Sequence, residues 1–222
     1  MRTIFLGYDF APDTHSAPRP QATHKVAVLY VFTVMREPLM NLSQRIAIAF
    51  TLLIAVTAPV SLANEALEAE VKTVYDSKLK ELFLYFHQNP ELSTMEHKTS
   101  ARLADELTAL GYTVHRNVGG TGIVALLENG EGPLVMFRAD MDGLPVEEKS
   151  GLAYASRAKQ IDPNGNEVFV MHACGHDVHI TSLVGTAQLM AEKRDQWLGT
   201  LMLIGQPAEE RVLGAAAMMA DN

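Results

Sequence analysis

The 222-residue sequence contains a single cysteine, Cys174, and therefore cannot form an internal disulfide. It has 18 basic residues against 26 acidic ones, a formal net charge of −8, and no run in which basic residues alternate with aromatic ones. Nucleic-acid-binding surfaces are typically basic, so we expect no nucleic-acid partner. No segment recurs at a fixed period either, which argues against solenoids and propellers.

Residues 1–39 contain four prolines among scattered polar residues, and their one compact apolar run, residues 26–34, is nine residues long. Nine residues are too few to cross a bilayer, which requires about 20. We therefore interpret residues 1–39 as a non-native or disordered extension, translated from too early a start.

Residues 40–63 have the layout of a secretory signal peptide. A short basic lead precedes an uninterrupted run of apolar residues and threonine at 46–56, and small residues end the segment with the spacing of a cleavage site. An uncleaved membrane anchor is the alternative, because residues 46–63 are nearly long enough to span a bilayer. Pro59 and the small residues favour cleavage after Ala63, which predicts a periplasmic or secreted mature chain without a stable membrane span.

From residue 64 onward, the apolar periodicity changes from helical to strand-like along the chain. Apolar spacings of three to five predict helices at 64–86 and 93–110, the second opened by a capping box at Ser93 and Glu96. Short apolar or alternating runs bounded by turn residues predict strands at 112–118, 123–127, 134–137, 168–171 and 201–204. Helices that alternate with strands indicate an α/β fold, a sheet with helices on both faces.

Five potential metal ligands lie within eight residues, where the strand at 168–171 is expected to lead into a helix: His172, Cys174, His176, Asp177 and His179. Residues two apart in extended backbone point the same way, so Cys174 and His176 can converge, and Gly175 lets the chain bend between them. A thiolate beside an imidazole suits zinc or a similar transition metal. Asp177 is expected to be the N-cap of the helix. A buried structural cysteine among histidines that only cap and pack is the alternative, but the density of ligands favours metal.

A pair of carboxylates, Glu209 and Glu210, follows the strand predicted at 201–204. Neighbouring side chains on extended backbone point to opposite sides, so one carboxylate can bind metal while the other takes a proton from water. An ordinary solvated loop is the alternative. Because strand ends in sheet enzymes meet at one edge, we expect this pair to lie beside the cysteine and histidine cluster.

A second pair, Asp140 and Asp142, follows the strand predicted at 134–137. The two share a side if the backbone stays extended, and they can then hold ligand histidines in orientation. Equally, they can form an Asp-Gly turn with Arg138 as a local ion-pair partner. The sequence pattern leaves both interpretations open.

Taken in order, these motifs resemble those of the metal-dependent amidohydrolases of the aminoacylase and carboxypeptidase superfamily. The nearest branch contains hippurate hydrolases and auxin-conjugate hydrolases. The matching segments are Arg-Ala-Asp-Met-Asp-Gly-Leu-Pro at 138–145, Met-His-Ala-Cys-Gly-His-Asp at 171–177, Gly-Gln-Pro-Ala-Glu-Glu at 205–210 and the opening motif His-Gln-Asn-Pro-Glu-Leu-Ser at 87–93. The resemblance covers the chain from Leu82 to its end.

The resemblance implies a role for each of these side chains. Cys174, His176 and Glu210 would bind one or two divalent ions, zinc or manganese, and Glu209 would be the general base. The supporting residues would be Asp140, Asp142 and Asp177. The family uses two further ligand histidines downstream of the Glu pair, and residues 211–222 contain no histidine.

The resemblance also implies an incomplete zinc-peptidase-like catalytic domain at 64–222 with a mixed central sheet. An inserted dimerisation domain, absent here, would follow residue 222, and the full-length form would be a homodimer. The implied activity is metal-dependent hydrolysis of the amide bond of N-acyl amino acids or small peptide-like conjugates. Two alternatives are a catalytically inactive metal-binding fragment of such an enzyme and a thiol enzyme with Cys174 as nucleophile.

Overall fold

The computed structural model describes residues 65–221. Both predictions for the N-terminal region, an extension at 1–39 and a signal peptide at 40–63, therefore lie outside the described residues. The compact unit that contains all the motifs extends from Val71 to the end of the chain. None of the helices in residues 65–221 is long and apolar enough to cross a bilayer.

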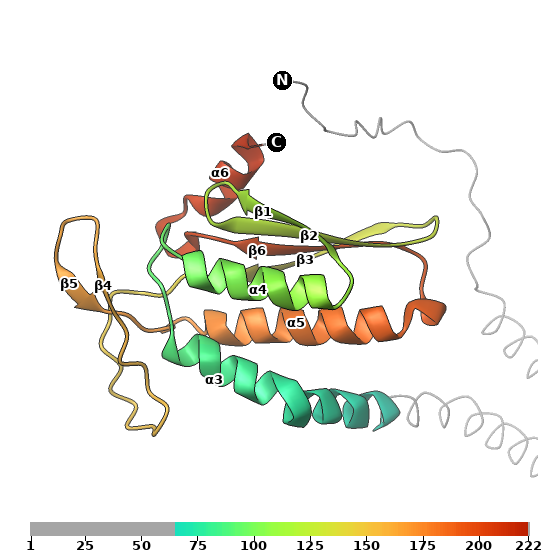
Figure 1. Cartoon of the computed structure of the whole chain (residues 1–222), viewed down its shortest axis with the longest axis horizontal. Helices are drawn as coiled ribbons and strands as arrows, with labels where there is room; N and C mark the ends of the chain where they lie inside the picture. Colours follow the sequence, from blue (N-terminus) through green and yellow to red (C-terminus); the bar gives the residue numbers. More distant parts are fainter. Residues whose placement is uncertain (1–64, 222) are drawn as a thin grey trace, which may run out of the picture. The chain divides into compact units, whose positions relative to one another are not determined.

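A four-stranded sheet forms the centre of this unit (Figure 1). Its strands lie in the order β1 (Thr113–Val118), β2 (Gly122–Asn129), β6 (Gly199–Gln206) and β3 (Leu134–Asp140). The β1–β2 and β2–β6 pairs are antiparallel, whereas β6 and β3 are parallel. The mixed central sheet is therefore confirmed.

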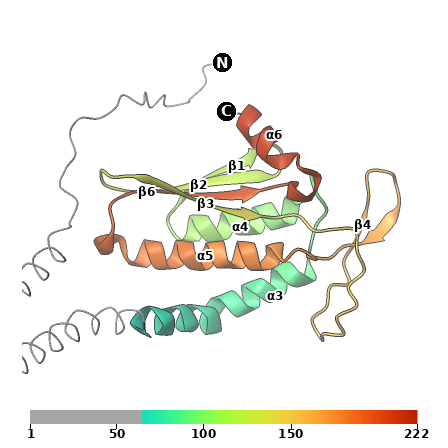
Figure 2. The same ribbon diagram turned by 180° about the vertical axis from the view of Figure 1, so that it is seen from behind.

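Three helices lie on one side of the sheet (Figures 1 and 2). Helices α4 (His97–Ala109) and α5 (His176–Glu192) pack against the strands, and α3 (Lys80–Gln88) packs against α5. A π-helical turn, η1 (Tyr75–Leu79), leads into α3. The apolar faces of these elements enclose one core with β2 and β6, and its fully buried members include Leu103, Leu107, Ile123, Ile180 and Leu203.

The predicted α/β class is confirmed, with the long helices of residues 71–221 gathered on one face. Alternation along β2 and β6 follows from this arrangement: Ile123 and Leu203 face the helices and are buried, while Val124 and Ile204 face the other way and are partly exposed. The far face therefore keeps an apolar character, and among the described residues only the short helix α6 (Gly214–Ala220) lies on that side, where it contacts β6 (Figure 1).

The strand at 134–137 was predicted to be buried, and this is wrong for the described residues. Leu134, Val135, Met136 and Phe137 are 59%, 47%, 55% and 50% exposed. The reason is their position, because β3 is the last strand of the described sheet and pairs with β6 alone. An apolar edge strand of this kind is a surface suited to pairing with another strand.

A strand does form in the stretch predicted at 168–171, but it lies outside the central sheet. Strand β5 (Glu167–Phe169) pairs with β4 (Lys159–Ile161) in a separate two-stranded hairpin. The residues after it are nevertheless held beside β3, because Met171 and Leu144 exchange two backbone hydrogen bonds of 3.0 and 2.9 Å. Short elements complete the fold: η2 (Arg194–Gln196), η3 (Glu209–Arg211) and α6 (Gly214–Ala220).

Both predicted helix starts use other groups than expected. At α4 the carboxylate of Glu91 accepts the amides of Lys98 and Thr99 at 3.1 and 2.7 Å, so the capping box at Ser93 and Glu96 does not form. Helix α5 begins after Gly175, which has a φ of +77°, and Asp177 lies in the first turn instead of at the N-cap. In both places the expected capping side chain is engaged elsewhere in the candidate site.

Candidate metal centre

The motifs at 138–145, 171–177 and 205–210 meet at the edge of the sheet where β3 and β6 end. In the parallel register Asp140 lies opposite Gln206, and the amide of Met141 donates to the carbonyl of Gln206 at 3.0 Å. Turn η3 follows β6 after two residues, and the Leu144–Met171 bridge holds the cysteine and histidine motif alongside. The structure thus brings together the clusters that the sequence predicted to share one edge.

His176 lies at the centre of this edge, with a side chain only 4% exposed. Its Nδ1 donates to the backbone carbonyl of Asp142 at 2.8 Å and lies 3.5 Å from Asp142 Oδ1. Its Nε2 faces two carboxylates, at 3.7 Å from Glu209 and 3.8 Å from Glu210. Burial alone would lower the pKa of His176, but the hydrogen bonds to Asp142 and the surrounding negative charge outweigh it and raise the pKa. Because Nδ1 is engaged, Nε2 is the nitrogen that remains to bind an ion.

Asp142 is a buried hub, 1% exposed. Besides His176, its carboxylate accepts the hydroxyl of Ser93 at 2.6 Å and the backbone amides of Glu209 and Glu210, each at 3.1 Å. Burial would raise the pKa of Asp142, yet these hydrogen bonds outweigh it and hold the pKa below its ordinary value. One carboxylate therefore fixes both the imidazole and the turn that carries the two glutamates.

Glu209 and Glu210 do not point to opposite sides, as extended backbone would require. They lie in the 3-10 turn η3, which follows Ala208 in the left-handed conformation at φ +47°, and both carboxylates approach His176. Their environments still differ, because the Glu209 side chain is 40% exposed and that of Glu210 is 16% exposed. The ligand atoms of His176, Glu209 and Glu210 lie within 4.8 Å of one another, a group that could hold a metal ion.

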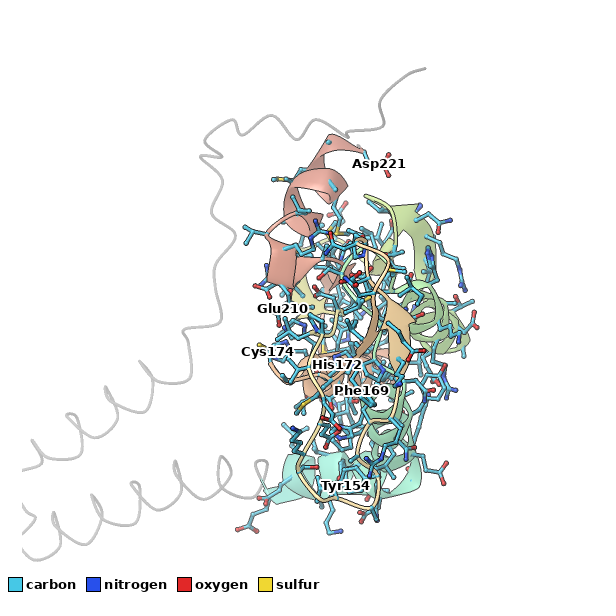
Figure 3. All side chains as sticks on the ribbon, turned by 90° about the vertical axis from the view of Figure 1, so that its left-hand side faces the viewer. Tyr154, Phe169, His172, Cys174, Glu210 and Asp221 are labelled. Atoms are coloured by element: carbon cyan, nitrogen blue, oxygen red, sulfur yellow. The ribbon has the colours of Figure 1, made fainter. Side chains whose placement is uncertain are left out.

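Cys174 is exposed and does not belong to that group of ligand atoms. Figure 3 shows its sulfur at the periphery of the site, beside Glu210, while His172 lies further inside. A hydrogen bond from the thiol to the Glu210 carboxylate raises the pKa of Cys174, and the nearby negative charges act in the same direction. Cys174 thus reaches the centre through Glu210, and not by converging with His176 along an extended strand.

The sequence left two interpretations open for Asp140 and Asp142, and each interpretation applies to one of the two residues. Asp142 orients His176, whereas Asp140 pairs with Arg138, with 3.3 Å between Arg138 Nε and Asp140 Oδ1. Asp140 also lies 3.7 Å from Nδ1 of His179 and could form a second ligand group with His176 and His179. The guanidinium already neutralises Asp140, so the group at Glu209 and Glu210 is better suited to a cation.

His87 is a residue of this region to which the sequence analysis assigned no role. Its ring bridges two carboxylates, with Nδ1 2.7 Å from Asp177 and Nε2 3.3 Å from Glu148. Burial would raise the pKa of Glu148, but hydrogen bonds from Ser150 and the Ser156 amide and the His87 contact hold it below its ordinary value. The opening motif that begins at His87 was the one signal of its importance.

His172, the first histidine of the motif, is 5% exposed, and neither ring nitrogen makes a hydrogen bond of normal geometry. Burial lowers its pKa to about 4. His172 is therefore neutral at pH 7. The structure places it behind the candidate ligands and in neither ligand group of the described residues.

Comparison with known proteins agrees with this arrangement. Residues 136–222 match the Peptidase family M20/M25/M40. The chain is 34% identical over 190 residues to IAA-amino acid hydrolase ILR1-like 2 of Arabidopsis thaliana, covering 81% of this chain and 41% of that protein. It is 41% identical over 139 residues to N-acetyl-L-cysteine deacetylase of Bacillus subtilis (strain 168), covering 62% of this chain and 31% of that protein.

A solved structure also aligns with the described fold. It is the Bacillus subtilis YXEP protein, described as a dinuclear metal binding peptidase from M20 family, with a TM-score of 0.59 and 32% identity over 67% of this chain and 40% of that one. This chain spans less than half the length of each of these three proteins. The resemblance to metal-dependent amidohydrolases and metallopeptidases is confirmed by the family match and by these relatives.

Proposed function

We propose that this M20-type chain contributes the first part of an enzyme that hydrolyses the amide bond of N-acyl amino acids or small peptide-like conjugates. The observation that carries the proposal is the convergence of Glu209 and Glu210 on Nε2 of His176, whose other nitrogen is fixed by Asp142. Relatives named as an N-acetyl-L-cysteine deacetylase and an IAA-amino acid hydrolase support this substrate class.

The residues present fit a divalent cation. Two carboxylates that approach one imidazole nitrogen repel each other unless a positive charge lies between them. An imidazole, a carboxylate and a thiolate are ligands that zinc accepts, and imidazole with carboxylates also suits manganese, so we propose zinc or manganese. His176, Glu210 and Cys174 would hold the ion. Once bound, it would supply Lewis acidity that polarises the scissile carbonyl and makes water more acidic.

Glu209 is the proposed general base. Its carboxylate is the more exposed of the pair and remains free of the thiol that bonds to Glu210. It would take a proton from the attacking water and pass it to the nitrogen of the leaving amine. Asp142 would keep Glu209 in place through the amide hydrogen bond at 3.1 Å, and Asp177 would support the site through His87.

The remaining parts of the enzyme are also proposals. The resemblance implies two further ligand histidines and a dimerisation domain. We propose that residues after position 222 of a longer chain supply them. Export through the segment at 40–63 would place the mature chain in the periplasm or outside the cell. Sequencing the N-terminus of exported protein tests export, because cleavage after Ala63 predicts that it begins at Asn64.

The experiment that tests the function separates the two glutamates in a chain extended to full length. Glu209→Gln keeps size and hydrogen bonding but removes the base, so turnover should fall by roughly a hundredfold while metal content stays unchanged. Glu210→Gln removes a charged ligand, so metal affinity should fall first, and excess metal should restore part of the activity. Glu167→Gln, on the exposed hairpin, is the matched control and should change neither.

Three outcomes would contradict parts of the proposal. Exchanged phenotypes would exchange the roles of the two carboxylates. If neither change affected metal content or turnover, the pair would be an ordinary solvated loop and the hydrolase assignment would fail. Stoichiometric zinc without hydrolysis of any N-acyl amino acid would instead favour an inactive metal-binding fragment.

A further inference from the structure

Glu96 is a fully buried carboxylate, 0% exposed, that lies outside the residues assigned above. Three hydrogen bonds reach it from other residues: from the backbone amide of Thr94 at 2.9 Å, from the hydroxyl of Thr121 at 2.5 Å and from the backbone amide of Ala208 at 2.8 Å. Within residues 65–221, no lysine, arginine or histidine pairs with it. Burying a carboxylate without a neighbouring cation costs free energy. The presence of Glu96 at this position therefore needs a specific explanation.

Ala208 supplies that explanation, because it precedes the two glutamates of the candidate metal centre. Its backbone is in the left-handed region at φ +47° and ψ +41°, which costs a residue with a β-carbon roughly 1 kcal/mol or more. Such a conformation persists when the surroundings impose it. Here three consecutive amides are held by two buried carboxylates: that of Ala208 by Glu96, and those of Glu209 and Glu210 by Asp142.

We propose that Glu96 is a positioning residue for Glu209 and Glu210, acting through the amide of Ala208 to hold the turn that aims both carboxylates at His176. The inference rests on the proposed function for its catalytic consequence, but the restraint on the turn is independent of it. Thr121 links the same carboxylate to the β1–β2 turn, so Glu96 ties the glutamate turn to the central sheet.

The chemistry of the three contacts defines a sharp pair of variants. All three partners donate a hydrogen bond to Glu96. The hydroxyl of Thr121 can also accept one. In Glu96→Gln the amide oxygen can still accept from Thr94 and Ala208, while the new NH₂ donates to Thr121. In Glu96→Leu no contact survives, and in Glu96→Asp the carboxylate is one C–C bond too short to reach Ala208. Positioning by hydrogen bonds therefore predicts that Gln is tolerated and that Leu and Asp are not.

Glu91 provides the matched control. It is also buried, at 7% exposure, and its carboxylate holds the start of α4 through Lys98 and Thr99 without contacting the glutamate turn. Glu91→Leu should therefore destabilise the fold by a comparable mechanism and leave the turn in place. The comparison separates a general loss of stability from a loss of positioning.

The first measurement is amide hydrogen exchange in the metal-free chain under native conditions. Glu96→Asp and Glu96→Leu should accelerate exchange at Ala208, Glu209 and Glu210 by at least tenfold relative to the interior of α4, and Glu96→Gln should not. Glu91→Leu should accelerate exchange at Lys98 and Thr99 instead. Because Glu96→Asp keeps a carboxylate and the fold, it gives a result even where Glu96→Leu does not fold. Unchanged exchange at Ala208 in Glu96→Asp would overturn the proposal.

The second measurement is zinc affinity and turnover in the chain extended to full length. Glu96→Asp should weaken zinc binding by tenfold or more and lower kcat with little change in KM, because substrate groups do not contact Glu96. Glu96→Gln and Glu91→Leu should bind zinc like the parent. Faster exchange with unaltered zinc affinity would refute positioning of the metal centre. Absence of zinc binding in the parent would refute the proposed function instead, and the exchange result would still decide whether Glu96 holds the turn.

Discussion

Replacing Asp142 by asparagine tests the centre of the site most directly. The carboxylate accepts from Ser93 and from the amides of Glu209 and Glu210, and its two oxygens take one amide each. Asparagine has the same shape but only one oxygen, so its NH₂ must face one of the two amides. That amide loses its partner in a buried place, at a cost of about 1–3 kcal/mol, and the other bonds lose their charge assistance.

We therefore expect Asp142→Asn to lower the free energy of unfolding by about 2 kcal/mol at pH 7. In urea this corresponds to a midpoint about 1 M lower, since the slope for a domain of this size is roughly 2 kcal/mol per molar. Zinc affinity should also fall by about 10- to 100-fold, because the variant loosens both His176 and the glutamate turn. Urea unfolding monitored by circular dichroism and a zinc titration measure the two effects.

Asp140→Asn is the matched control for this variant. Asp140 is also buried, at 7% exposure, but it accepts no amide from the glutamate turn, and its partner is Arg138. It should therefore cost less stability than Asp142→Asn and change zinc affinity less. A loss below about 0.5 kcal/mol for Asp142→Asn, or equal zinc affinity in the two variants, would refute the hub role of Asp142.

Three further predictions concern other parts of the unit. Hydrogen bonds hold the pKa of Glu148 below its ordinary value of 4.5, so its extra stability is present above pH 4.5 and is lost as pH falls through the lowered pKa; unfolding titrations of Glu148→Gln and the parent should converge there. The Cys174 thiol should be alkylated faster after a chelator removes metal, and equal labelling would exclude coordination. Leu103→Ala should destabilise the chain by about 2–5 kcal/mol in urea, because Leu103 is fully buried, and a smaller loss would contradict the assigned core.

The elements that sequence reasoning predicted well are those defined by local periodicity. The apolar run at 123–127 lies within β2, and the segment at 112–118 forms β1, which pairs with β2. Glu209 and Asp140 each lie a few residues after a predicted apolar strand, and both reach one edge of the sheet because β6 and β3 are parallel neighbours. These inferences required only which residues end a strand.

The parts that failed depend on contacts between residues far apart in the chain. Apolar residues at 134–137 predict burial, but exposure is decided by whether a neighbour covers the strand, and β3 has β6 alone. His87 acquires its place from Asp177 and Glu148, which lie 90 and 61 residues away in sequence. No local pattern indicates these partners, whereas the opening motif at 87–93 at least marked the segment.

For the glutamate pair, the structure changes the geometry on which the expected division of roles was based. Extended backbone would send Glu209 and Glu210 to opposite sides, and the difference in role was inferred from that. In the structure both approach one nitrogen of His176, because two carboxylates that are distant in sequence, Glu96 and Asp142, bind three consecutive amides and curl the chain after β6. What then distinguishes the pair is the surroundings: Glu210 is more enclosed and bonds the thiol, while Glu209 is more open. The division into ligand and base therefore rests on burial and partners, and a variant that straightened the turn should abolish metal binding before it altered the fold.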